Sequence, residues 1–310
     1  MAKLDGRIFM TGGSGTLGRA IVNHAIQKGW KTLFTIYSRD PMKQAAMRGA
    51  WYNVGGVKCQ FVIGDVRDQN SLLRAMAGHD TVLHLAAMKH IPQAEADPDA
   101  CYEINVTGSR HVLDAALIHG INDVVLITTD KACKPINAYG CTKMMMERLA
   151  LVYSETGMDV YLPRYGNVIE STGSVLVRWK KQISEGKPIS VTDPKMTRFW
   201  LTPARAAEIV VESLDYPNLV YVPRLPALSI EKVIEYSLGE PEMEIIGLRP
   251  GEKIHEELLT WEESAFAVRQ DDFILVRPPT SERYEPFMNY SSDKAPEIDR
   301  NSMRAMLGLK

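Results

Sequence analysis

The sequence has few of the features that mark secreted, membrane-bound or nucleic-acid-binding proteins. Its 310 residues include only four cysteines, Cys59, Cys101, Cys133 and Cys141, and their spacing matches neither a metal site nor a disulfide framework. Lys and Arg number 36 against 38 Asp and Glu, so no excess of positive charge indicates a nucleic-acid partner. No apolar run approaches the length of a membrane span, and the N-terminus lacks the pattern of a secretion signal. We therefore expect a cytoplasmic protein with free thiols, no metal, no membrane contact and no nucleic-acid partner.

Apolar runs and helical patterns alternate regularly along the first part of the chain, up to about residue 168. Near-continuous apolar strands separated by helices are typical of a parallel sheet covered on both faces. The predicted fold class is therefore α/β, with a doubly wound parallel sheet in residues 1–168. Strands are expected at 7–11, 31–37, 58–64, 81–87, 123–129 and 158–168, and helices at 16–28, 71–77, 98–119 and 138–156.

The alternation fades in the second part of the chain, residues 169–310. Helical patterns are expected at 173–186, 203–214 and 229–238, between proline-rich connections and short strands. We expect this part to form mainly a smaller, substrate-binding lobe at the C-terminal edge of the sheet, with room for some of its strands to return to that sheet.

A glycine-rich loop, TGGSGTLG, follows the first strand directly and opens the first helix. Glycine permits the tight turn and the close approach of backbone to a pyrophosphate, and the helix N-terminus adds N–H donors and a positive dipole. In this position the loop predicts dinucleotide binding and a Rossmann-type sheet, although a tight turn without a ligand has the same local pattern. The residues expected at the cofactor are Gly12, Ser14, Gly15, Thr16, Leu17 and Gly18.

The end of the second strand bears on the choice between NADP and NAD. Ser38, Arg39 and Lys43 can surround a 2′-phosphate, which favours NADP, whereas Asp40 is the kind of residue that binds a free ribose hydroxyl in NAD enzymes. After the third strand, Asp65 and Val66 suit the adenine edge, but Asp65 is equally compatible with a helix cap or turn.

Several longer segments carry a resemblance to a known family: YSRD, GDVRD, LAAMKHIP, TTDKACKPINAYGCTK, RYGNV, MTRFW and RPGEKIHEELL. With them the chain resembles the extended short-chain dehydrogenases/reductases. More narrowly, it is similar to the UDP-N-acetylglucosamine 4,6-dehydratases that invert C5 at the start of pseudaminic acid synthesis. The resemblance implies a UDP-sugar substrate and NADP, with Ala86 and Ala87 also at the cofactor. It also implies a homo-oligomer in which the helices at 98–119 and 139–156 pair across a dimer interface.

The Tyr-x-x-x-Lys pattern of Tyr139 and Lys143 places both side chains on one helical face. An ammonium beside the phenol, together with an oxidised nicotinamide, should lower the pKa of Tyr139 and make it a usable base. Thr129, with Thr128 as an adjacent candidate, is expected to hydrogen-bond the same substrate hydroxyl.

Asp130 and Lys131 follow the fifth strand, at the edge where open α/β sheets bind ligands. Oxidation at C4 needs only the tyrosine and a hydride acceptor, so two further ionisable groups indicate a further step, which the resemblance identifies as elimination of water. Lys131 would take the C5 proton and Asp130 would protonate the leaving C6 hydroxyl. These roles require a lowered pKa for Lys131 and a raised one for Asp130.

The resemblance places further residues at the substrate and shows two departures. Glu170 and Thr172 stand where the family commonly has a neutral residue and an arginine, which bears on substrate affinity, and Cys133 and Cys141 flank the catalytic segment. Arginine suits a diphosphate because its planar fork donates two parallel hydrogen bonds. The expected substrate-binding residues are Lys89, His90, Asn167, Arg198, Arg249 and Glu252.

Two other features are assigned to packing, and three alternative functions stay open. His84, inside an apolar strand, is expected to be a hydrogen-bonded core histidine, and the run Met144–Met146 is expected to pack rather than to bind a ligand. The alternatives to an inverting dehydratase are a C5-retaining dehydratase, a UDP-sugar epimerase, and a catalytically silent NADP-binding regulator.

Overall fold

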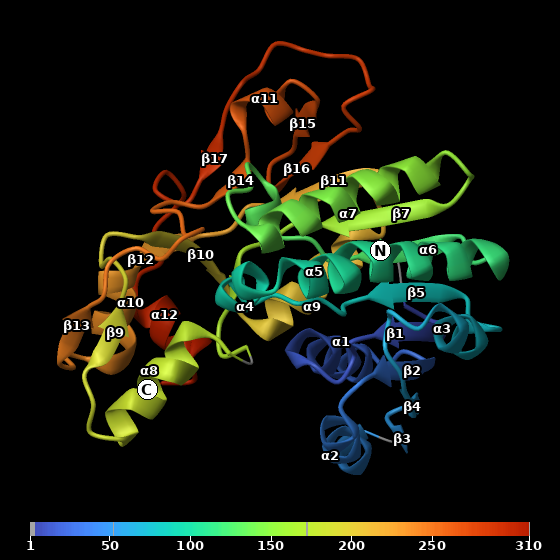
Figure 1. Cartoon of the computed structure of the whole chain (residues 1–310), viewed down its shortest axis with the longest axis horizontal. Coiled ribbons are helices and arrows are strands. Elements are labelled where there is room, and N and C mark those ends of the chain that lie inside the picture. Colours follow the sequence, from blue (N-terminus) through green and yellow to red (C-terminus); the bar gives the residue numbers. More distant parts are fainter. Residues whose placement is uncertain (1–3, 52, 172, 310) are drawn as a thin grey trace.

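A ten-stranded sheet forms the centre of the computed structural model, which describes residues 4–51, 53–171 and 173–309 (Figure 1). The strand order is β15-β16-β11-β7-β6-β5-β1-β2-β4-β3. Neighbouring strands from β11 to β4 run parallel, whereas β3, β16 and β15 pair antiparallel at the two edges. The predicted fold class, a Rossmann-type doubly wound parallel sheet, is confirmed.

The strands of this sheet come from both parts of the chain. In chain order they are β1 (Gly6–Thr11), β2 (Thr32–Ser38), β3 (Asn53–Val54), β4 (Val57–Ile63), β5 (Thr81–His84), β6 (Asp123–Leu126), β7 (Asp159–Pro163), β11 (Leu219–Pro223), β15 (Ala267–Arg269) and β16 (Phe273–Val276). Three of them, β11, β15 and β16, follow residue 168, so the second part of the chain contributes to the central sheet as well as to a lobe of its own.

Helices cover both faces of the sheet. The helices of the first part are α1 (Thr16–Gln27), α2 (Pro41–Trp51), α3 (Gln69–Met76), α4 (Ile91–Ala96), α5 (Pro98–Tyr102), α6 (Gly108–Ile118) and α7 (Ala138–Ser154). Phe9 of β1 belongs to the same hydrophobic core as α3, α6 and α7, whereas its neighbours Ile8 and Met10 belong to a second core with α1, α2 and α9 (Pro203–Ser213). This alternation along one strand is what a sheet buried on both faces requires.

The smaller lobe has its own hydrophobic core, centred on Trp179 and Trp200 and lying beside the sheet in Figure 1. Its helices are α8 (Val175–Ser184), α10 (Ile230–Leu238) and α12 (Arg300–Met306). Its strands are β8 (Asn167–Val168), β9 (Ile189–Val191), β10 (Thr197–Leu201), β12 (Ala227–Ser229) and β13 (Met243–Ile245). The segments β14 (Glu257–Leu259), α11 (Trp261–Ser264) and β17 (Tyr290–Ser291) complete the chain.

The structure differs from the sequence prediction in three local ways. The run 158–168 splits into β7 and β8, and β8 pairs with β10 in a separate sheet. The chain turns away after Pro163, and at Gly166 a β-carbon would lie 2.6 Å from Cβ of Phe199, so only glycine fits. Helix α2 was not predicted; the Asp40 carboxylate caps it by accepting hydrogen bonds from the backbone of Met42 and Lys43.

The third difference lies in the predicted helix 98–119, which contains a π-helical turn, Glu103–Thr107, between α5 and α6. In the part of the chain that the structure describes, no helix combines the length and the apolar character needed to cross a bilayer.

Candidate functional site

The glycine-rich loop lies between the end of β1 and the start of α1, packed against the end of β5. Gly12 has φ +65°, and a β-carbon there would lie 2.7 Å from the backbone nitrogen of Ala86; at Gly18 it would lie 2.1 Å from the Gly13 carbonyl. The N-cap residue of α1, Gly15, supplies no side-chain hydrogen bond to the helix N-terminus. Because the N-cap residue is a glycine, the chain can approach a ligand closely at the N-terminus of α1, an arrangement that fits the pyrophosphate of a dinucleotide.

The side chains after β2 are partly committed to local contacts. The Ser38 hydroxyl accepts hydrogen bonds from Ser14 (2.9 Å) and from Gln44 (3.0 Å). Asp40 caps α2 and lies 3.4 Å from the Lys43 ammonium. Arg39 extends into solvent, 3.7 Å from the Asp65 carboxylate.

Beyond β4, Asp65 forms a turn and an ion pair with Arg67, 2.7 Å away, which is the turn alternative left open by the sequence. Val66 is buried and packs against Gly108 of α6, where a β-carbon would lie 2.7 Å from a Val66 methyl group.

The loop after β5, which carries Ala86 and Ala87, is held from two sides. The backbone N–H of Ala86 donates to the Thr11 hydroxyl. The Asn105 side chain, in the π-helical turn, bonds both backbone groups of Met88 and also donates to Thr142 of α7. The sequence prediction missed Asn105, because only the folded chain brings this turn beside the β5 loop.

Tyr139 and Lys143 lie on the buried side of α7, near its N-terminus. The Asn137 side chain caps this helix through Gly140 N–H and donates to the Gly251 carbonyl, so it ties α7 to the RPGEK segment. Burial raises the pKa of Tyr139 to about 12, against the lowering effects of Lys131 and of a hydrogen bond to Thr129. The direction is opposite to the expected one. Burial also lowers the pKa of Lys143 to about 8, so this amine readily loses its charge.

Asp130 and Lys131 lie in a short 3-10 turn, Asp130–Ala132, that follows β6, and Lys131 also contacts a third residue, Glu256. The Lys131 ammonium lies 3.0 Å from Asp130 Oδ1 and 3.3 Å from Glu256 Oε1. Asp130 is fully buried and Glu256 is 3% exposed. We refer to these three residues as the site cluster. The sequence prediction missed Glu256, since nothing in the local pattern links it to residues 130 and 131.

The site cluster shifts the pKa values of its members in different directions. Burial, reinforced by Glu256, raises the pKa of Asp130 despite Lys131. Burial opposes the charge on Lys131, but the two carboxylates outweigh it and raise the pKa of Lys131. The raised pKa of Asp130 is the direction that an acid role requires, whereas the direction found for Lys131 is the reverse of the one a base requires.

Among the described residues, a few buried polar side-chain atoms have no hydrogen-bond partner, and two of them belong to the site cluster. Such atoms are rare in folded proteins and call for a ligand, a water molecule or a functional reason. Two belong to the site cluster, one to β8, one to the loop that precedes α8, and one to the first turn of α1: Asp130 Oδ2, Glu256 Oε2, Asn167 Oδ1, Ser174 Oγ and Arg19 Nε. A polar ligand bound across the carboxyl edge of the sheet would reach several of them.

Other residues expected at the substrate lie around the same edge. Lys89 is exposed on the loop after β5. The His90 ring packs against Gly173, where a β-carbon would lie 2.1 Å from ring carbon Cε1. Arg249 and Glu252 form a loose pair, 3.8 Å apart, and are partly exposed.

Arg198 is the expected substrate residue that the structure uses most fully for internal contacts. Its guanidinium donates to the carbonyls of Thr197 (2.7 Å), Lys253 (2.9 Å) and Ile254 (3.0 Å), and lies 4.0 Å from Glu256. These contacts hold the RPGEK segment against β10 and next to the site cluster.

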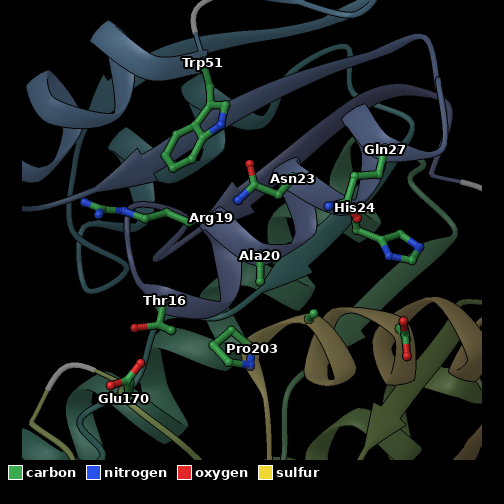
Figure 2. A pocket seen from close by; sticks show the side chains of 11 residues that line it. Thr16, Arg19, Ala20, Asn23, His24, Gln27, Trp51, Glu170 and Pro203 are labelled. Carbon is green, nitrogen blue, oxygen red and sulfur yellow. The ribbon is translucent and has the colours of Figure 1, made fainter. Parts of the chain in front are cut away.

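A hollow of about 570 Å³ lies on the outer side of α1 (Figure 2). Its lining includes Thr16, Arg19, Trp51, Glu170 and Pro203. Glu170, one of the two departures, has φ +52° and pairs with Lys180 at 2.7 Å, so its carboxylate lies near the glycine-rich loop. The other departure, Thr172, lies outside the described residues.

The remaining expectations concern residues beside the site. His84 is buried, and its ring nitrogens bond Thr11 (2.7 Å) and Ser109 (3.0 Å); burial lowers its pKa to about 3, so it is the hydrogen-bonded core histidine that was expected. Met146 is buried in the core. Cys141 is exposed, whereas Cys133 is buried.

A separate buried ion network connects α7 with α11. The sequence prediction missed it. Arg164 donates to Glu147 of α7, to Glu263 of α11 and to the Leu258 carbonyl, and all five of its N–H bonds are used. Thr128 donates to Glu147, and the Cys133 thiol donates to Glu263. We refer to Glu147, Arg164 and Glu263 as the framework cluster.

Comparison with known proteins relates this fold and site to enzymes of nucleotide-sugar metabolism. Residues 8–278 match the family described as "Polysaccharide biosynthesis protein". The chain is 34% identical to a UDP-N-acetylglucosamine 4,6-dehydratase (inverting) of Campylobacter jejuni over 87% of this chain and 82% of that protein. It is 37% identical to a UDP-glucose 4-epimerase of Rickettsia rickettsii, over 85% and 80%.

Among solved structures, Pen from Bacillus thuringiensis is similar over 99% of both chains, with a TM-score of 0.89 and 30% identity. The agreement extends over the central sheet and the smaller lobe together. Since the family match covers most of the chain and two relatives exceed 30% identity over most of its length, this chain belongs to the polysaccharide biosynthesis protein family.

Proposed function

We propose that the protein is a UDP-N-acetylglucosamine 4,6-dehydratase that inverts C5 and uses NADP. The observation that carries this proposal is the site cluster beside Tyr139: an acid–base pair, with one unpaired buried carboxylate oxygen on Asp130, next to the tyrosine expected to take the proton of the 4-hydroxyl. The name of the Campylobacter relative supports the reaction and its stereochemistry.

The redox half of the reaction falls to Tyr139, Lys143 and Thr129. Tyr139 accepts the proton of the sugar 4-hydroxyl, with Thr129 bonded to the phenol and Lys143 on the same helical face. A bound nicotinamide would supply the hydride acceptor for oxidation at C4 and the hydride donor for reduction at C6. The raised pKa of Tyr139 means that removing its own proton needs the positive charge that an oxidised nicotinamide brings.

The elimination half falls to Asp130 and Lys131. The 4-ketone acidifies the C5–H bond; Lys131 in its neutral form takes this proton, and Asp130 gives a proton to the departing C6 hydroxyl. The hydrogen bond of 3.0 Å between them lets the proton of Lys131 move to Asp130, which produces the base and the acid together. Desolvation by a bound sugar favours this neutral pair over the ion pair. C5 then takes a proton from solvent on the opposite face, which gives the inverted 4-keto-6-deoxy sugar, and Tyr139 releases to solvent the proton that it took from the 4-hydroxyl.

The glycine-rich loop and the residues after β2 support a nicotinamide dinucleotide, and NADP in particular. The N-terminus of α1, which follows the N-cap residue Gly15, would hold the pyrophosphate, with Ala86 and Ala87 beside it. Asp40 is engaged as the cap of α2 and the partner of Lys43, so it is less available to a ribose hydroxyl, whereas Arg39 is extended and exposed. Tighter binding of NADP⁺ than of NAD⁺, with the preference lost in Arg39→Ala, would test this assignment.

A UDP-sugar epimerase is the second candidate, because the relative from Rickettsia rickettsii carries that name at 37% identity. Epimerisation at C4 does not require an acid–base pair beside the tyrosine, so the site cluster favours dehydration. The chain's own residues thus favour the dehydratase, whereas the identities to the two relatives are similar.

One experiment separates the candidates. The purified protein is incubated with UDP-N-acetylglucosamine and NADP⁺ in deuterated water, and the product is examined by NMR. A 4-keto-6-deoxy sugar with deuterium at C5 and inverted configuration supports the proposal. The retained C5 configuration indicates the retaining dehydratase, the C4 epimer indicates an epimerase, and unchanged sugar indicates a silent NADP-binding protein.

The protein is further proposed to be a homo-oligomer that pairs through α6 and α7. Large apolar side chains on these helices remain exposed in the single chain: Leu117, Ile118, Met145 and Val152. Sedimentation of the wild-type protein beside Ile118→Glu tests this pairing, since a buried charge at such an interface would favour the monomer.

A further inference from the structure

Glu256 links the site cluster to the RPGEK segment: its carboxylate lies 3.3 Å from Lys131 and 4.0 Å from Arg198. It follows the RPGEK segment, and its backbone N–H donates to Ser292 of the β17 region at 3.0 Å. Oε1 faces Lys131 at 3.3 Å, and Oε2 lies 3.7 Å from Lys253 without a hydrogen-bond partner. The side chain is 3% exposed, so its charge acts in a poorly solvated environment.

The charges around Glu256 decide which carboxyl group of the site cluster is ionised. One ammonium, Lys131, faces two carboxylates, and it cannot neutralise both. Glu256 has two more cations, Lys253 and Arg198, whereas Asp130 has none besides Lys131. These cations lower the pKa of Glu256 against the effect of burial, while burial and Glu256 raise the pKa of Asp130.

Hydrogen bonds from Lys253 and Arg198 hold the segment that carries Glu256 in a defined position. Lys253 also donates to the Cys133 carbonyl at 2.8 Å, one turn beyond Lys131. Arg198 bonds the carbonyls of Lys253 and Ile254. The segment is therefore tied directly to the loop that bears Asp130 and Lys131.

We propose that Glu256 is a positioning residue for the elimination step: it serves as the counter-ion of Lys131 whenever that amine is charged, aims the amine, and thereby leaves Asp130 free to hold the proton that the departing hydroxyl needs. The role rests on the proposed dehydratase function. Without Glu256, Asp130 becomes the sole carboxylate partner of Lys131 and ionises, as in an ordinary ion pair.

The test compares Glu256→Gln, which keeps the shape and removes the charge, with Glu257→Gln as a matched control. Glu257 is the adjacent glutamate, and it pairs with the exposed Lys134 at 3.6 Å. For Glu256→Gln we expect kcat for dehydration to fall about tenfold or more with KM nearly unchanged. Loss of a negative neighbour lowers the pKa of both Asp130 and Lys131, so the whole pH–rate profile moves to lower pH. Glu256→Asp, which retains the charge, should keep most of the wild-type profile.

A second measurement does not depend on the reaction. The side-chain NMR signal of Lys131 in protein with isotopically labelled lysine, identified by its absence in Lys131→Met, is titrated with pH. The pKa of Lys131 should fall in Glu256→Gln and stay unchanged in Glu257→Gln. Failure of the wild-type protein to dehydrate the sugar would overturn the proposed function alone. An unchanged pKa of Lys131 in Glu256→Gln, or a pH–rate profile of Glu256→Gln equal to the control's, would overturn the role of Glu256. Should Glu256→Gln not fold, the pKa of Lys131 is measured in Glu256→Asp, where we expect a smaller shift, and no shift there would overturn the role.

Discussion

The two buried charged clusters each combine one basic side chain with two carboxylates, but their hydrogen bonds are completed to different degrees. In the framework cluster, Arg164 uses all five N–H bonds, and no oxygen of Glu147 or Glu263 is among the unpaired buried atoms found in the described residues. In the site cluster, Asp130 and Glu256 each keep one buried oxygen without a hydrogen-bond partner. Leaving a buried polar atom unpaired costs about 1–3 kcal/mol, so the site cluster is maintained at the expense of stability. The comparison indicates that a cluster whose buried polar atoms are all hydrogen-bonded serves the fold, whereas a cluster that keeps unbonded buried oxygens fits a ligand-binding site.

The largest expected effect is on chemistry, from Lys131→Met in the site cluster. We expect C5 proton exchange and dehydration to fall by about 10²–10⁴-fold, because the base is lost, while some reduction of the cofactor by substrate remains. Stopped-flow absorbance of the reduced nicotinamide measures the first step, and deuterium incorporation measures the second. Full dehydratase activity in this variant would remove Lys131 from the mechanism.

The next effect is on stability, from Arg164→Met in the framework cluster. Removal of the shared cation leaves Glu147 and Glu263 buried without a partner, and we expect a loss of about 3–5 kcal/mol in the free energy of unfolding. Urea denaturation measures it. Lys131→Met should lose less, because Asp130 can take a proton and Glu256 keeps Lys253 and Arg198. Equal losses in the two variants would contradict the distinction between the clusters.

The contributions of the two clusters to the free energy of unfolding should change with pH in opposite directions. The pKa of Asp130 is raised by burial, so its contribution to stability is favourable only when it is protonated and is lost as the pH rises through its folded value. The pKa of Glu263 is lowered by Arg164, which outweighs burial, so its contribution is present above its unfolded pKa and is lost in acid.

Two conservative variants test these opposite changes with pH. Asp130→Asn should be about 0.5–2 kcal/mol more stable than the wild type at neutral pH, with the gain shrinking in acid, whereas Glu263→Gln should be less stable at neutral pH and approach the wild type in acid. Unfolding is measured for the three proteins over a pH series. The same slope for both variants would show that the clusters do not differ as described.

Local pattern was sufficient for the parallel strands of residues 1–168 and for part of the expected site. The strand and helix alternation, the glycine-rich loop, the shared face of Tyr139 and Lys143, and the core role of His84 all follow from residue spacing and side-chain chemistry. The pairing of Lys131 with Glu256 did not, because it depends on how a segment of the second part of the chain docks on the first. The raised pKa of Tyr139 could not be predicted from spacing either, because it is caused by burial, and a local pattern does not show how deeply a side chain is buried.

The smallest effect is expected at the surface. Arg205 on α9 pairs with Glu208 and Glu212, like Arg164 with its two glutamates, but all three side chains are more than a third exposed. Water solvates the remaining groups when one partner is removed, so Arg205→Met should change the free energy of unfolding by no more than about 1 kcal/mol. Raising the salt concentration should reduce even this difference, whereas the loss in Arg164→Met should persist because buried pairs are screened much less. A loss at Arg205 as large as that at Arg164 would mean that the count of charges, rather than their burial and pairing, governs both networks.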